Sequence, residues 1–414
     1  MNADLAPAKQ RENAQGRPAL SRMGCPRPTW WYAVAAWLGQ RLLLLALVVL
    51  WKSLTGSLTP NRLLAIWAQY DGQWYVSIAQ TGYRSIGQAA FFPLFPALMW
   101  LVAPLFGGNV ALTGILLANG AALGAFIALG RLIEAELGAH VTQRALLYYA
   151  VLPTGYFLAS AYTESIFLLL SVAAFLCMRQ RRWLLAGLLM TLATLTRAPG
   201  ALLTLPLAIE AWRTLRPSRT TICTRQRISE ALSVACSVIA PFAAILGFHV
   251  YLTHVYGVAD AMSRALALPQ WRRSLDWPWT GLVTDLTSIG PANHAGRPPS
   301  YPATVVIDLV FLALWLGKCV AMVAPARPAF APRLPYSWVT YSWVALLQVL
   351  ILPSHVPGYG LMSLPRYVIV VFPCFTMLAL FSLRFPRAHV LMFGLSLASM
   401  IFLFTVCCAG GFVA

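Results

Sequence analysis

The chain has 414 residues, of which 59% are hydrophobic and only 10% are charged, and its formal net charge is +18. A soluble domain carries about 25% charged residues, so this composition excludes a soluble enzyme and indicates a polytopic membrane protein. The positive charge does not indicate nucleic-acid binding, because the basic residues fall in short clusters between apolar runs, as in the cytoplasmic loops of membrane proteins.

The first part of the chain predicts a basic tail followed by a membrane span. Residues 1–29 are polar and basic, so we expect a cytoplasmic tail by the positive-inside rule. They are not expected to be a cleavable signal peptide, because the apolar run that follows is too long. Residues 30–51 are long enough to cross a hydrocarbon core of about 30 Å. Gln40 and Arg41 interrupt this run, so that face is expected to look into the protein.

Residues 53–90 are predicted to form the first external loop. Within it, residues 63–79 have apolar and aromatic side chains at helical spacing, which predicts an amphipathic helix in the membrane interface. A loop helix packed on the spans fits the pattern equally well. Asp71 lies in this stretch, and a carboxylate is costly to keep near lipid, so we interpret it as a functional residue. The alternative is an exposed loop acid that caps a helix starting near Gly72.

Further apolar runs predict an all-α protein with about 10 to 12 transmembrane helices. These runs cover residues 91–106, 110–132, 145–160, 166–178, 183–211, 228–253, 303–323, 337–353, 368–383 and 390–413. The first of them is roughly 24 Å long as a helix. It is either re-entrant, or Arg131 and Arg144 break the charge rule. Arg197, Pro199 and Gly200 are expected to divide the run over residues 183–211 into two short helices or to kink it.

The loops between these runs separate into two groups. The strongly basic loops are placed in the cytoplasm; they cover residues 179–182, 213–227, 327–333 and 384–387. The stretches at residues 162–165, 197–200 and 354–367 then fall on the opposite side, together with Asp71. Residues 254–300 form a second large external loop on that side, and loops of this length are usually functional or mobile. The motif-like stretches therefore converge on one external face.

Glu164 and Arg197 are candidate binding residues. Glu164 lies in a polar island, Tyr162 to Ser165, between two apolar runs, where it can hold a sugar hydroxyl. The alternative is a helix start, with Glu164 near the positive end of the helix dipole. Arg197 lies in the middle of apolar sequence and needs an anionic partner, which is either a lipid phosphate or a structural ion pair with Glu164 or Glu210.

The stretch S-L-P-R-Y supplies a second arginine, Arg366, and its neighbour Tyr367. Arginine forms bidentate contacts with phosphate, so Arg366 is a candidate ligand for a lipid-phosphate donor; the alternative is snorkelling of its side chain to the interface. His355 is a lone loop histidine, which is more often structural than functional, and it remains a weaker candidate. Arg272 and Arg273, which lie beside tryptophans, could meet a charged or sugar substrate, but the expected interpretation is a solvated loop.

Several motifs are absent. There is no Walker A motif, no dinucleotide-binding glycine pattern and no soluble region to hold a nucleotide-sugar. No metal-ligand array of cysteine, histidine or carboxylate residues is visible. Any activated sugar is therefore expected to arrive by the membrane, and we expect neither a metal nor a cofactor.

Four stretches in order resemble one family. The stretch W-A-Q-Y-D-G-Q-W-Y-V-S-I-A-Q-T-G-Y followed by F-F-P-L-F-P resembles the PIG-V-like mannosyltransferases, typified by the second GPI mannosyltransferase and including bacterial members. The later stretches A-Y-T-E-S-I-F, L-T-R-A-P-G and S-L-P-R-Y-V-I-V-V-F-P are similar as well. The resemblance covers residues 67–373. The family usually has tryptophan before the acid, whereas this chain has Tyr70 before Asp71.

The resemblance implies a GT-C type fold with the catalytic aspartate, here Asp71, in the first external loop. It also implies an inverting glycosyltransferase that takes mannose from a polyprenyl- or dolichyl-phosphate donor. The acceptor hydroxyl is not identified. We expect a multi-pass protein of the inner (plasma) membrane with an extracytoplasmic active site, or of the endoplasmic reticulum membrane if the chain is eukaryotic.

The mechanism expected from these residues has Asp71 as the base that deprotonates the acceptor. Arg197 and Arg366 are expected to stabilise the departing lipid phosphate, and Tyr162 and Glu164 to line the sugar or acceptor pocket. The alternative function is a transporter or lipid flippase without covalent chemistry. A cavity beside Asp71 that opens outward favours the enzyme, whereas a central cavity between symmetric halves favours the transporter.

Overall fold

The computed structural model describes residues 29–55, 59–215, 224–288, 301–324 and 334–411. Most of these residues are helical, and the one pairing of extended backbone among them is an isolated bridge between Arg273 and Ser354. The expected all-α architecture is confirmed. The expected cytoplasmic tail lies, except for Thr29, outside the described residues, as does the basic loop at residues 327–333.

The first half of the chain forms α1 (Trp30–Leu54), α2 (Pro60–Ile66), α3 (Asp71–Thr81), η3 (Ile86–Ala90), α4 (Leu94–Val102), η4 (Ala103–Phe106), α5 (Val110–Leu137), α6 (Ala139–Ala150), η5 (Gly155–Leu158), α7 (Glu164–Arg179), α8 (Trp183–Thr194), η6 (Ala198–Leu203) and α9 (Thr204–Leu215). The second half forms α10 (Thr224–Tyr256), α11 (Ala261–Leu266), α12 (Thr280–Ser288), α13 (Tyr301–Val323), α14 (Tyr336–Leu350), α15 (Leu364–Tyr367), η8 (Val368–Val370), α16 (Phe372–Arg384) and α17 (Pro386–Cys408). Here η marks a 3₁₀ helix.

Five helices in the described ranges are long and apolar enough to cross a membrane, namely α1, α5, α10, α13 and α17. The count reaches six if α15 with η8 and α16, which meet at a bend of 81°, are taken as one broken span. The multi-pass membrane character is thus confirmed, but fewer long helices form than the 10 to 12 expected. The other apolar runs form shorter helices; proline interrupts several of them, as at Pro153, Pro199 and Pro373.

Two of the ambiguous runs resolve into short helices. The run over residues 183–211 is divided into α8 and α9 by η6, as expected from Pro199 and Gly200. The run over residues 91–106 forms α4 and η4, which end at the left-handed pair Gly107 and Gly108 before α5 begins. A helix of this length is roughly 20 Å, which is short of the hydrocarbon core.

The interior of the bundle consists of α5, α6, α7 and α16. Small residues line α5, and a Cβ at Gly124 would lie 3.2 Å from Leu169 of α7, so these two helices pack closely. Tyr149 of α6 contacts Phe375 of α16, with ring centroids 4.7 Å apart. In contrast, only 17% to 28% of the apolar windows of α1, α10, α13 and α17 is buried. These four helices present their apolar side chains outward, as helices in contact with lipid do.

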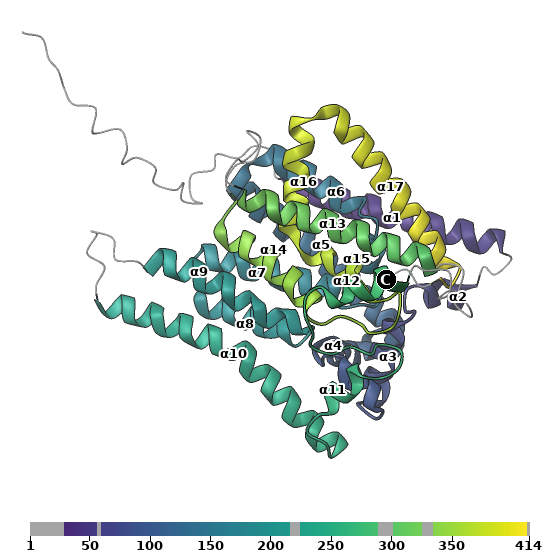
Figure 1. Ribbon diagram of the computed structural model, residues 1–414, viewed down its shortest axis with the longest axis horizontal. Coiled ribbons are helices and arrows are strands. Elements are labelled where there is room, and N and C mark those ends of the chain that lie inside the picture. Colours follow the sequence, from purple (N-terminus) through teal and green to yellow (C-terminus); the bar gives the residue numbers. More distant parts are fainter. Residues whose placement is uncertain (1–28, 56–58, 216–223, 289–300, 325–333, 412–414) are drawn as a thin grey trace, which may run out of the picture.

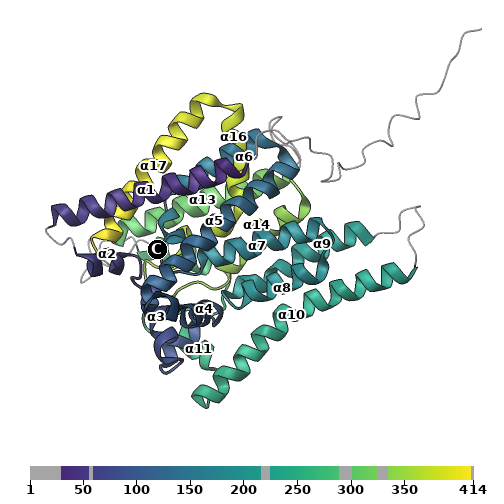
Figure 2. The same ribbon diagram turned by 180° about the vertical axis from the view of Figure 1, so that it is seen from behind.

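The short helices gather at one end of the bundle. Figures 1 and 2 show α3, α4 and α11 together at this end, and η3 packs against α11. The last turn of α9, which contains Arg213, lies at the opposite end, and α10 runs from there back to α11. The bundle therefore has one basic end and one end built of short helices and turns.

Candidate active site

Asp71 lies at the corner between α2 and α3. It is the first residue of α3, and the N–H of Gly72 donates to the carbonyl of Gln69 at 2.9 Å, which closes a four-residue turn. Tyr70 has φ 50° and ψ −115° there, a conformation that glycine usually adopts in type II′ turns. A non-glycine residue in this conformation is strained, and such strain is common at functional sites. The turn replaces the middle of the single helix expected over residues 63–79.

Tyr70 is anchored by the far end of the chain. Its hydroxyl donates to the carbonyl of Gly410 at 2.7 Å, just beyond the end of α17. This hydrogen bond to the backbone accompanies the strained turn that presents Asp71.

The polar island before α7 is bound to the same turn. The N–H of Ala161 donates to the carbonyl of Trp67 at 2.7 Å, and the hydroxyl of Tyr162 donates to the carbonyl of Gln69 at 2.9 Å. The hydroxyls of Tyr75 and Thr163 lie 3.4 Å apart. These contacts hold the start of α7, and with it Glu164, directly behind Asp71.

Burial controls the protonation of the two tyrosines at this contact. It raises the pKa of Tyr162 well above the ordinary value, and the Asp71 carboxylate raises this pKa further. Burial, followed by Asp71, likewise raises the pKa of Tyr75. Both hydroxyls therefore stay protonated at neutral pH, and the Tyr162 hydroxyl donates to the Gln69 carbonyl.

A network of two acids and two arginines runs through the site. Arg366 donates from Nη1 to Oδ2 of Asp71 at 2.6 Å and contacts Oε1 of Glu164 through Nε at 2.7 Å. Arg197 donates from Nη1 to the same Glu164 oxygen at 2.5 Å. Glu164 is fully buried, whereas the side chain of Asp71 is 23% exposed. Both arginines contact Oε1 of Glu164, whereas its Oε2 is buried without a hydrogen-bond partner among the described residues. Asp71 is the acid that reaches solvent.

Arg197 is placed by close backbone packing. It sits in extended conformation between α8 and η6. A Cβ at Gly200 would lie 2.2 Å from the backbone nitrogen of Thr194, so only glycine fits this reversal. The N–H of Leu94 donates to the carbonyl of Leu195 at 2.9 Å, which joins the F-F-P-L-F-P stretch to the T-R-A-P-G stretch.

The loop before Arg366 is held by α12. Asp285 accepts hydrogen bonds from the N–H groups of Gly360 at 2.6 Å and Leu361 at 3.1 Å. A Cβ at Gly360 would lie 2.1 Å from the carbonyl oxygen of Gly281, so the loop and α12 touch through their backbones. Burial raises the pKa of Asp285, although the two N–H donors oppose this shift. Asp285 thus fixes the segment that delivers Arg366 to Asp71.

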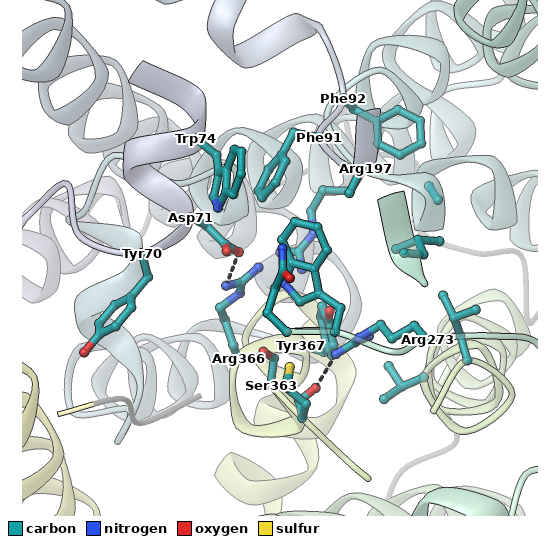
Figure 3. A pocket seen from close by; sticks show the side chains of 18 of the residues that line it. Tyr70, Asp71, Trp74, Phe91, Phe92, Arg197, Arg273, Ser363, Arg366 and Tyr367 are labelled. Atoms are coloured by element: carbon teal, nitrogen blue, oxygen red, sulfur yellow. Dashed lines mark hydrogen bonds and ion pairs between the residues drawn. The ribbon is translucent and has the colours of Figure 1, made fainter. Parts of the chain in front are cut away.

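These elements surround a cavity of about 540 Å³, which lies within the range of small-molecule sites. Its charged lining residues are Asp71, Arg197, Arg273 and Arg366. Figure 3 shows Asp71 and Arg366 pointing toward one another, with Arg197, Tyr367 and Arg273 around the same space. The remaining wall is largely aromatic and apolar, with Trp74, Phe91, Phe92, Trp271, Met262, Leu266, Val349 and Leu352 among its residues.

Of the seven residues singled out in the sequence, four line this cavity: Asp71, Arg197, Arg366 and Tyr367. Tyr162 and Glu164 were expected on the pocket wall, but they lie behind it. Tyr162 packs under the Arg366 guanidinium, 5.2 Å from the ring centroid, and Glu164 holds the two arginines.

His355 is placed away from this wall. Its Nε2 lies 2.9 Å from Ser274 Oγ and 3.7 Å from Asp276 Oδ2, and His355 is not among the cavity-lining residues. Arg273 does line the cavity, although a solvated loop was expected there. Arg273 lies in a loop rich in tryptophan, proline and arginine, and this composition pointed to a functional loop. No sequence pattern indicated that Arg273 lies close to Tyr367.

A family model described as Mannosyltransferase (PIG-V) matches residues 45–256, half of the chain. The matched part contains Asp71, Glu164 and Arg197, whereas Arg273 and Arg366 lie beyond it. No curated protein and no solved structure matches the chain. The family model and the membrane-spanning helices together make this chain a membrane glycosyltransferase, and it belongs to the PIG-V mannosyltransferase family.

Proposed function

We propose that this mannosyltransferase takes mannose from a polyprenyl-phosphate donor and transfers it, with inversion, to an acceptor hydroxyl on the extracytoplasmic side. One observation carries the proposal. Asp71 lines the cavity with one carboxylate oxygen held by Arg366, while its other oxygen, Oδ1, accepts no hydrogen bond from any described residue. A carboxylate oriented through one oxygen and free at the other suits a general base.

The proposed reaction has a single displacement. The acceptor oxygen attacks the anomeric carbon as its proton passes to Asp71. The bond between that carbon and the phosphate oxygen breaks, and its electron pair stays on the phosphate. Arg366 and Arg197 stabilise the charge that develops there, while Glu164 and Tyr162 orient these arginines and Tyr367 forms part of the wall. We give His355 no contact with the substrate.

The extracytoplasmic placement rests on charge. Residues of α3, α11 and α15 line the cavity. Figures 1 and 2 show α3 and α11 at the end opposite the last turn of α9. Basic segments such as Arg213 in α9 favour the cytoplasmic side. The inner (plasma) membrane is the membrane that this arrangement suits in a bacterial cell. The transporter alternative requires a central cavity between related halves, and the position beside Asp71 gives it no support.

The test is transfer of radiolabelled mannose from polyprenyl-phosphate-mannose in membranes, comparing the wild type with Asp71→Asn at equal amounts of folded protein. Loss of a general base costs about 10²- to 10⁴-fold in rate. Normal transfer by Asp71→Asn would remove Asp71 from the mechanism. Transfer by neither protein, from any polyprenyl-linked sugar offered, would overturn the donor class.

We also propose that the transfer needs no metal ion, because the arginines supply the positive charge at the phosphate. Among the described residues, no three histidine, cysteine or acidic side chains form a group that could hold a metal. Transfer should therefore be unchanged after treatment with EDTA, and a loss that Mg²⁺ or Mn²⁺ restores would contradict the proposal.

A further inference from the structure

The charges at the cavity do not balance. Three arginines, Arg197, Arg273 and Arg366, line it, but only Asp71 and the buried Glu164 accompany them. Both acids are already engaged: Glu164 holds Arg197 and Arg366, and Asp71 holds Arg366. These five side chains therefore carry one excess positive charge, and Arg273 is the arginine among them that has no ion pair.

Arg273 has donors left for a ligand. Its Nη2 donates to the backbone carbonyl of Met362 at 2.7 Å, and its backbone forms the bridge to Ser354. No acid of the described residues forms an ion pair with it. Asp308 in α13 interacts with Arg273 electrostatically but forms no ion pair with it, unlike Glu164 with Arg197 and Arg366, so the charge count covers only the three arginines and the two acids that pair with them. The guanidinium, which has five donors, is thus held in place by a neutral carbonyl and keeps its charge for the cavity.

All three guanidinium groups converge on one ring. Their carbon atoms lie 5.0 Å (Arg197), 5.7 Å (Arg273) and 5.8 Å (Arg366) from the centroid of Tyr367. An aromatic face attracts cations but carries no net charge, so it does not offset their mutual repulsion. An anion in the cavity would offset it, and it would find its free partner at Arg273.

We propose that Arg273 binds the donor phosphate, and that protonation of Asp71 during transfer releases Arg366 to the phosphate as it departs. This inference rests on the function proposed above. The donor is a phosphodiester with a single negative charge, which equals the excess of one positive charge at the resting site. Before transfer Arg273 contacts the phosphate while Arg366 is held by Asp71. Arg366 reaches the phosphate only when the reaction adds negative charge to it.

The charges balance at both ends of the step. Before transfer the acids and arginines sum to +1 and the phosphodiester to −1. When Asp71 takes the acceptor proton, the residues sum to +2. The released polyprenyl phosphate is a monoester, whose charge is about −1.5 to −2 at neutral pH. Loss of the Asp71 charge also weakens its ion pair with Arg366, so the second arginine becomes available when the second phosphate charge appears.

Asp71→Asn imitates the protonated state and gives the first test. The purified variant should bind polyprenyl phosphate more tightly than the wild type, by at least about fivefold, because Arg366 loses its charged partner and its donors become available to the phosphate. The measurement is thermophoresis in detergent, with inorganic phosphate as a second probe that separates the headgroup from the lipid. Equal or weaker binding of polyprenyl phosphate by Asp71→Asn would overturn the release of Arg366.

Arg273→Gln tests the resting contact. It should raise KM for the donor and weaken binding of polyprenyl phosphate by about tenfold or more, with a smaller effect on kcat. Arg272→Gln is the matched control, because Arg272 is the exposed neighbour that does not line the cavity. Equal donor KM and phosphate binding in Arg273→Gln and Arg272→Gln would overturn the assignment.

A further variant, together with the transfer rates, distinguishes a failure of this inference from a failure of the proposed function. If Arg273→Gln does not fold, Arg273→Lys keeps the charge but cannot contact both Met362 and a phosphate as a guanidinium does, so several-fold weaker binding is expected. Unchanged binding by Arg273→Lys would count against the proposal. Phosphate binding that depends on Arg273 without any mannose transfer would reject the proposed function alone. Transfer that depends on Asp71 but not on Arg273 would reject this inference alone.

Discussion

Asp71 and Arg366 are separated by 295 positions in the sequence, and they form an ion pair at 2.6 Å in the wall of the cavity. The pair joins the first residue of α3 to the short helix α15. A single turn such as α15 cannot hold Arg366 in place by itself, and Asp71 stands at the very start of its helix. The ion pair therefore helps to position both side chains. Glu164 completes the arrangement by holding Arg366 from behind.

Arg366→Lys should lower transfer about 10²- to 10³-fold, the usual cost of removing one preorganised donor. A lysine ammonium is a point charge and cannot contact Asp71 and Glu164 with the fixed geometry of Nε and Nη1. The measurement is kcat for mannose transfer at equal amounts of folded protein. Arg264→Lys is the control, because Arg264 pairs only with the exposed Asp260. Similar rates in the two variants would show that the geometry of Arg366 is unimportant.

Glu164→Gln should destabilise the protein by about 3–5 kcal/mol, because it leaves the buried Arg197 without an acid and Arg366 with Asp71 alone. Glu210→Gln is a matched control: Glu210 is equally buried and accepts from Ser337 at 2.7 Å and Arg179 at 3.4 Å, away from the cavity. Both variants should melt earlier in detergent. Only Glu164→Gln should also change kcat and donor KM, and a kinetic effect of the same size in Glu210→Gln would refute a specific role for Glu164.

Gly360→Ala should displace the loop that carries Arg366, since its Cβ would lie 2.1 Å from the Gly281 carbonyl oxygen. Overpacking of this kind costs about 1–3 kcal/mol, and transfer should fall with it. Gly394→Ala in α17 has no atom within 4 Å of the added Cβ. It should change stability by less than about 1 kcal/mol. Melting temperatures and transfer rates of the two variants test this difference. Equal values for Gly360→Ala and Gly394→Ala would show that the loop can move to accommodate the added Cβ.

Asp285 predicts a pH dependence of stability. Burial raises its pKa in the folded protein, so the folded state binds this proton more tightly than the unfolded chain. The contribution to stability is therefore fully present below the ordinary carboxyl pKa and is lost as the pH rises through the raised pKa. Melting temperatures of the wild type should decline over this interval, and Asp285→Asn should remove that part of the slope. Parallel profiles for the two proteins would contradict the prediction.

Membrane class and helical content follow from composition, because a chain with 10% charged residues cannot cover a water-facing surface. Local interruptions were also predictable. Pro199 and Gly200 divide their apolar run because one lacks a backbone donor and the other permits a reversal. The continuous helix expected over residues 63–79 was wrong in its middle, because the strained Tyr70 turn depends on contacts with segments far along the chain.

The sequence by itself determined an all-α membrane protein and its family, and it made Asp71 the first candidate for the site, since these depend on composition and on short motifs. Only the tertiary structure decided that Glu164 lies behind the cavity, that His355 lies outside it and that Arg273 lines it. Side-chain partners are set by the packing of helices, and packing joins residues that no local spacing relates. The charge at the cavity is such a property, because it depends on five residues from five separate segments: Asp71, Glu164, Arg197, Arg273 and Arg366.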